Sequence, residues 1–179
     1  MTDFKIKTRK LAVSAIISAL CVVILYLGSA INIFDLTAVA VVSLIMMFAV
    51  SEIGFPFHWA IYGVVAVLSM LLLPDKFAAV AFLVLGGIYP ILRPRLEKMP
   101  VAVSFIMKLL YFNVVLTGII AASLFVLKIK DDRLGFNILT YSLGNVTIFL
   151  YDFCIGIISN AYIKYFRKLL KADKLFGKK

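Results

Sequence analysis

Apolar residues fill long blocks of this chain between Leu11 and Tyr165, and the charged residues gather in short clusters between the blocks. The apolar blocks cover approximately residues 11–31, 36–50, 57–73, 77–92, 101–127 and 137–165. A helix needs about 20 apolar residues to cross the hydrocarbon core of a bilayer. The connections carry Asn, Asp, Gly or Pro, which disfavour continuation of a helix. The pattern predicts an all-α integral membrane protein, built as a bundle of six transmembrane helices.

The composition indicates that the bilayer is the solvent for most of this surface. Of the 179 residues, 64% are hydrophobic, which is more than one soluble core of this size requires. The chain contains no linker rich in Pro or Ser, so we expect residues 1–179 to form a single membrane domain. Residues 164–179 alternate basic and apolar side chains. They form either an amphipathic helix on an anionic lipid leaflet or simply a retained cytoplasmic end.

The distribution of Lys and Arg predicts the orientation, because positively charged loops stay on the cytoplasmic side. With the N-terminus inside, the inner segments at residues 5–10, 93–98 and 164–179 carry fourteen basic residues, and the outer segments carry four. Both termini are therefore expected in the cytoplasm. This topology, together with attraction to anionic lipid, accounts for the net charge of +10, which gives no reason to expect a nucleic-acid partner.

The sequence lacks the usual motifs of catalysis and metal binding. His58 is the only histidine, which excludes an HExxH motif and a site built from several histidines. Cys21 and Cys154 lie in apolar blocks without the spacing of a metal or redox site. No GxxxxGK[ST] loop is present, so this chain cannot bind ATP through that motif. We expect neither an enzyme nor a bound metal or cofactor.

Three charged residues are expected at membrane depth: Lys108 and Asp152 lie inside the fifth and sixth apolar blocks, and Glu52 ends the second. An unpaired charge in the membrane costs about 3 kcal/mol or more on insertion scales, so it usually has a partner. We therefore expect Lys108 to pair with Asp152 or with Glu52. Such a pair either fixes the register of the helices or takes part in coupling or gating.

A stripe of polar residues lies at the start of the last apolar block. Asn137, Tyr141 and Asn145 follow one another at intervals of four residues, so they share one face of a helix. A lipid-facing Asn is costly. The stripe is therefore expected either to form hydrogen bonds between helices or to contact a ligand in the outer half of the membrane.

The first apolar block follows the basic residues Lys7, Arg9 and Lys10, and it contains a pair of small residues four positions apart. The segment Ala15-Ile16-Ile17-Ser18-Ala19 places Ala15 and Ala19 on one helix face, where another helix can approach closely. The approaching helix belongs either to this chain or to a partner.

A chain of this length, with six apolar spans, cytoplasmic termini and a basic N-terminus leading into an Ala-xxx-Ala helix, resembles the substrate-binding S component of energy-coupling factor (ECF) transporters. The resemblance implies that Ala15 and Ala19 dock onto a coupling subunit, which works with two ATPases. It also implies a multi-pass protein of a bacterial plasma membrane. The ligand would be a small water-soluble micronutrient, a vitamin or its precursor, held in the outer half near Asn137, Tyr141 and Asn145, with Lys128 near the entrance.

Two other classes of function stay open at this point. One is a non-transporting membrane scaffold of the MreD-like type, in which the Ala15 and Ala19 face binds a permanent partner and the polar stripe only holds helices together. The other is a stand-alone channel or secondary transporter, to which the three intramembrane charges are the only pointer. Ligand binding by the polar stripe would distinguish the S component from the scaffold. Transport without ATPases would indicate the channel or secondary transporter.

Overall fold

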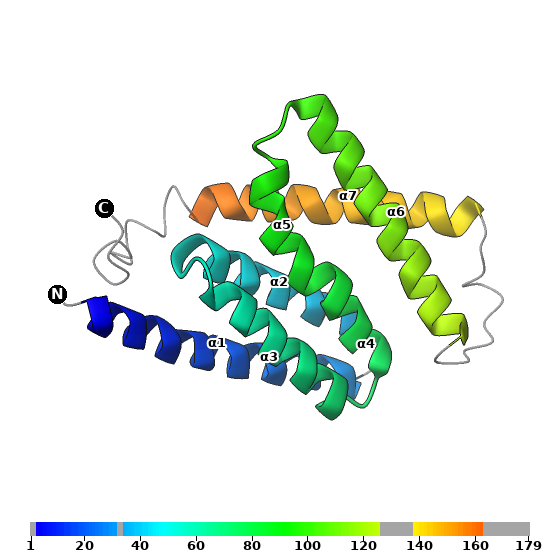
Figure 1. Cartoon of the computed structure of the whole chain (residues 1–179). Coiled ribbons are helices and arrows are strands. Elements are labelled where there is room, and N and C mark those ends of the chain that lie inside the picture. Colours follow the sequence, from blue (N-terminus) through cyan, green and yellow to red (C-terminus); the bar gives the residue numbers. More distant parts are fainter. Residues whose placement is uncertain (1–2, 32–33, 126–137, 163–179) are drawn as a thin grey trace. The chain divides into compact units, whose positions relative to one another are not determined.

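The computed structural model describes residues 3–31, 34–125 and 138–162, and every structural statement below refers to these residues (Figure 1). They form helices joined by short turns, with no β-strand among them. The elements are α1 (Asp3–Ile31), α2 (Asp35–Glu52), α3 (Phe57–Leu72), α4 (Lys76–Ala81), the π-helix η1 (Phe82–Gly87), α5 (Ile88–Leu96), α6 (Val101–Phe125) and α7 (Ile138–Ala161).

The predicted all-helical class is confirmed. Five stretches have the length and the apolar composition of a membrane span, namely Lys5–Ile31, Asp35–Glu52, Lys76–Leu96, Val101–Gly118 and Tyr141–Ala161. The remaining apolar helix, α3, has 16 residues. The described helices thus include five to six that suit a multi-pass membrane protein. The exact number of crossings and the cytoplasmic position of the termini stay predictions.

The helices extend beyond the predicted apolar spans where polar residues continue them. The fourth block was expected to end at residue 92, but the helix continues to Leu96, with Pro94 inside it. The first helix begins at Asp3, eight residues before the apolar block. The reason is the same in both places: hydrophobicity delimits the apolar part of a segment, whereas backbone hydrogen bonding continues through residues such as Arg93 and Arg95.

The helices belong to two compact units, Met1–Ile91 with Ile155–Lys179, and Leu92–Cys154, which are described separately. In the first unit, α1 packs against α2 and α3, and α2 packs against η1 (Figure 1). Its core consists of apolar side chains from all of these helices, among them Cys21, Leu25, Val42, Met46, Ile61, Val65, Ala79 and Phe82.

The π-helix η1 packs closely against α3. A Cβ atom on Gly87 would overlap the Tyr62 ring, so only glycine fits at this point. The Tyr62 hydroxyl donates a hydrogen bond to the Leu83 carbonyl at 3.3 Å. A backbone carbonyl has two lone pairs, so it can accept such a bond from a neighbouring helix in addition to a bond within its own helix.

The turn between α2 and α3 is fastened to the start of α1. Gly54 in this turn has a φ angle of 74°, a left-handed conformation that glycine adopts without steric cost. The Lys10 ammonium donates a hydrogen bond to the Ile53 carbonyl at 3.0 Å. Because Ile53 is the C-terminal cap of α2, the cation also lies at the negative end of that helix dipole.

The second unit contains the end of α5, all described residues of α6 and the part of α7 up to Cys154. The Phe105 and Phe149 rings stack with their centroids 5.3 Å apart. Gly144 allows a close approach of the two helices, because a Cβ atom there would lie 2.7 Å from the Leu116 Cδ2 atom. This contact brings the polar side chains of α6 and α7 within hydrogen-bonding distance.

Candidate functional site

Ala15 and Ala19 line a groove on the surface of the first unit. Its volume is about 300 Å³, and Ala60 and Val64 of α3 line it together with residues of α1. All four of these side chains are exposed. The small-residue pair predicted from the sequence is therefore not covered within this unit, and it forms one wall of a groove that is open to the surroundings.

The two buried serines of the groove have their hydrogen bonds inside α1. The Ser14 hydroxyl donates to the Lys10 carbonyl at 2.7 Å, and the Ser18 hydroxyl donates to the Ser14 carbonyl at 2.9 Å. Backbonding of this kind satisfies a hydroxyl without a partner from another helix. The groove is therefore apolar in character although two of its lining residues are serines.

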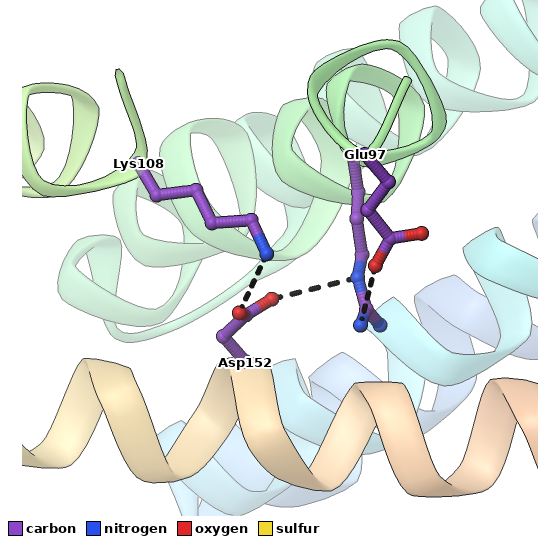
Figure 2. A network of polar contacts seen from close by, with 4 residues as sticks. Glu97, Lys108 and Asp152 are labelled. Atoms are coloured by element: carbon purple, nitrogen blue, oxygen red, sulfur yellow. Dashed lines mark hydrogen bonds and ion pairs between the residues drawn. The ribbon is translucent and has the colours of Figure 1, made fainter. Parts of the chain in front are cut away.

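In the second unit, four charged side chains form a network (Figure 2). The Lys108 ammonium lies 2.7 Å from the Asp152 Oδ2 atom, and the Arg93 Nε atom lies 3.4 Å from Asp152 Oδ1. A second Arg93 nitrogen, Nη2, lies 2.8 Å from the Glu97 Oε1 atom. The network contains two cations and two carboxylates, so its charges sum to zero. Lys108 pairs with Asp152, and Arg93 lies near both carboxylates.

The structure distinguishes between the two partners expected for Lys108. Asp152 forms the ion pair, and the two side chains are 14% and 18% exposed. Glu52 belongs to the first unit, where it is 1% exposed and accepts a hydrogen bond from the Tyr162 hydroxyl at 3.4 Å. The three intramembrane charges are thus divided between two local environments.

Arg93 is a member of the network that the sequence reasoning missed. It was counted among the loop charges of the inner side, but its side chain is only 9% exposed. Glu97 follows it by four residues, a spacing at which an ion pair forms on a helix. That spacing was the available signal that the helix continues past residue 92.

Two residues of the polar stripe, Tyr141 and Asn145, lie on α7 and pair with α6. Asn145 and Asn113 exchange two hydrogen bonds of 3.3 Å, each amide nitrogen donating to the other amide oxygen. The Tyr141 and Thr117 hydroxyls are 2.9 Å apart. Thr117 follows Asn113 by four residues on α6, whereas its partner Tyr141 precedes Asn145 by four residues on α7. This opposite order is expected for antiparallel helices. These hydrogen bonds are interhelical, which is one of the two roles expected for the stripe.

Two of the predicted substrate-binding residues, Asn137 and Lys128, lie outside the described residues. The sequence reasoning also missed Asn113 and Thr117. Their signal was available: they are polar, four residues apart and located in an otherwise apolar span, like Tyr141 and Asn145. Two polar stripes of equal spacing in consecutive antiparallel helices indicate that the stripes face each other.

Two further hollows occur in the second unit. A groove of about 520 Å³ on α6 has mostly apolar lining, with Asn113 and Thr117 as its polar side chains. A smaller hollow of about 270 Å³ lies beside the ion network and includes Glu97, Lys108 and Asp152. Within the described part of the chain, no group of three or more His, Cys, Asp or Glu side chains is placed to hold a metal ion.

Comparison with known proteins gives no relative: no family model matches the sequence, and no curated protein or solved structure matches it.

Proposed function

We propose that this chain is the membrane-embedded substrate-binding subunit of an ATP-driven uptake system, an S component of the ECF type. The supporting observation is the groove between α1 and α3, in which Ala15 and Ala19 are exposed beside Ala60 and Val64. In this proposal the groove receives a helix of the coupling subunit, and the two ATPases bind to that subunit. The transported compound is a small water-soluble micronutrient.

The physical basis of docking is packing between helices. In lipid no hydrophobic effect drives helices together, so association depends on van der Waals contact and on close approach of the backbones. Alanines at an interval of four residues permit this approach over one helical turn. The groove also has no unsatisfied serine hydroxyl, because Ser14 and Ser18 bond within α1. An apolar partner helix can therefore cover the groove without leaving a buried serine hydroxyl unsatisfied.

Uptake further requires a site that changes with the state of the complex. Only a partner or ligand with different affinities for two states shifts the equilibrium between them. In the proposed mechanism the substrate site is the outer end of α6 and α7, where Tyr141 and Asn145 exchange their bonds to Thr117 and Asn113 for bonds to the substrate. Asn137 and Lys128 complete the predicted set.

The test is to purify the tagged protein gently from its own membrane and to analyse the complex by native mass spectrometry. We expect a coupling subunit, ATPases and a retained small molecule to accompany the wild-type protein. Ala15→Leu and Ala19→Leu fill the groove, so both variants should lose the partner subunits. Ala12→Leu is the matched control, because Ala12 is exposed on the same helix but does not line the groove.

The outcomes separate the proposal from its alternatives. Co-purification of cell-envelope proteins without ATPases and without a ligand contradicts the transport proposal. Retention of the ATPases by Ala15→Leu and Ala19→Leu contradicts the assignment of the groove as the docking surface.

A membrane scaffold of the MreD-like type is the second candidate, and one observation favours it. The polar side chains of α7 that were candidates for ligand contact are engaged by α6, through the reciprocal Asn113 and Asn145 bonds. Tyr141→Ala and Asn145→Ala distinguish the two functions. If these variants assemble normally but lose a bound small molecule, the scaffold is excluded. If they disturb assembly and no ligand is found in the wild-type protein, the scaffold is favoured.

A further inference from the structure

The start of α1 and the turn between α2 and α3 lie at one end of the first unit, which carries exposed basic side chains and exposed aromatic rings. Lys5, Lys7 and Arg9 are exposed on the first turns of α1. Phe55 in the turn is 78% exposed and Trp59 at the start of α3 is 37% exposed. We name this surface, made of these five residues, the basic–aromatic end.

A hydrogen bond joins the first turns of α1 to the turn between α2 and α3. Lys10 directly follows Arg9, and its ammonium donates to the Ile53 carbonyl at 3.0 Å. Figure 1 shows the start of α1 at the same end of the first unit as the turn that links α2 and α3. Lys10 is thereby engaged within the protein, whereas the three preceding basic residues remain exposed.

The Glu52 carboxylate is buried and does not form part of this surface. Glu52 ends α2 next to the turn, but it is 1% exposed and accepts a hydrogen bond from Tyr162. The aromatic rings are also held in place, since the Trp59 ring meets the Tyr62 ring edge-on at a centroid distance of 6.0 Å. The surface therefore presents exposed rings beside exposed cations.

The depth of these residues identifies the ligand. The apolar part of α1 begins at Leu11, and Lys5 precedes it by six residues, or about 9 Å of helix. The interfacial layer of a bilayer is roughly 5–8 Å thick on each side. Arg9 and Lys7, about 3 and 6 Å from Leu11, fall within the headgroup layer, and Lys5 lies at its outer edge. Aromatic rings are enriched at that level, and cations there attract anionic headgroups.

The geometry points to a binding surface for anionic phospholipid headgroups at the basic–aromatic end, with Lys5, Lys7 and Arg9 contacting the phosphates and Trp59 lying at the boundary with the acyl chains. The surface concentrates anionic lipid around α1. It requires neither a substrate nor a coupling subunit, so it is independent of the transport proposal.

The chain contains a single tryptophan, and that residue lies in the surface under test. Quenching of Trp59 fluorescence by lipids brominated on the acyl chains therefore reports which lipid is adjacent to it. The protein is reconstituted into vesicles of phosphatidylcholine and phosphatidylglycerol at a fixed ratio, with the bromine placed on one lipid or on the other. We expect stronger quenching by brominated phosphatidylglycerol at low salt and a smaller difference at high salt.

The variant Lys5→Gln/Lys7→Gln/Arg9→Gln should remove this preference. Each basic residue near an anionic surface strengthens binding about fivefold, so neutralising three of them weakens it about a hundredfold. Arg95→Gln/Lys98→Gln is the control, because it neutralises two exposed basic residues of the second unit and leaves the basic–aromatic end unchanged. Equal quenching by the two brominated lipids in the wild-type protein overturns the inference, as does a preference that persists in the triple variant.

Discussion

Removing the Asp152 carboxylate should destabilise the protein more than removing the Lys108 ammonium. Asp152 faces two cations, Lys108 at 2.7 Å and Arg93 at 3.4 Å. Asp152→Leu removes the carboxylate from both cations, although Arg93 keeps its ion pair with Glu97. Lys108→Met, by contrast, leaves Asp152 with Arg93. The two substitutions remove one charge each, so the difference between them measures the arrangement and not the number of charges.

The magnitudes follow from burial. Breaking a buried ion pair costs about 3–5 kcal/mol, and the side chains of this pair are 14% and 18% exposed, which places it near the lower end of that range. We therefore expect Asp152→Leu to lower the free energy of unfolding by about 3 kcal/mol, and Lys108→Met to lower it by less because Asp152 then keeps Arg93. In the double variant the two losses should fall short of additivity by about 1–2 kcal/mol, the usual coupling between contacting groups.

The assay is unfolding of the purified protein in mixed micelles of increasing denaturing detergent, followed by far-UV circular dichroism. Lys98→Met serves as the control, because Lys98 is exposed at the turn between α5 and α6, and its removal should change the free energy of unfolding by no more than about 0.5 kcal/mol. The reasoning is refuted if Lys108→Met is the more damaging substitution, or if the losses of the two single variants are additive within about 0.5 kcal/mol.

Two further predictions concern close contacts between helices. Asn145→Leu should lower the free energy of unfolding by about 0.6–1.7 kcal/mol, and adding Asn113→Leu should lower it little further, since the two amides bond to each other; an additive double variant in the same assay contradicts this. Gly87→Ala should be destabilising by about 1–3 kcal/mol because the new methyl group overlaps the Tyr62 ring, whereas Gly63→Ala, which meets nothing within 4 Å, should be neutral or stabilising; equal effects in thermal unfolding argue against the close contact.

The helices could be predicted from the sequence because their apolar blocks are long and are separated by residues that disfavour helix. Their ends could not, since α5 continues through Arg93 and Arg95, which hydrophobicity alone assigns to a loop. The need of Lys108 for a carboxylate was predictable from the cost of an isolated charge in lipid. The choice of Asp152 over Glu52 was not, because it depends on which helices are neighbours.

For the candidate sites, the residues that share a helix face could be predicted, but what packs against that face could not. A spacing of four identifies residues that share a helix face, as for Ala15 with Ala19 and Tyr141 with Asn145, but it does not say what covers that face. In the structure one face is open to a groove and the other is engaged by α6. The difference depends on the packing of helices distant in sequence, which periodicity within one helix cannot reveal.

The charge balance of the network around Asp152 has an electrical consequence. Two cations and two carboxylates at standard ionisation carry no net charge. Moving one elementary charge across a membrane potential of 100 mV involves about 2.3 kcal/mol of electrical work. The neutral group of four side chains can therefore change its depth with the helices that bear it, and the membrane voltage does no net work on that displacement.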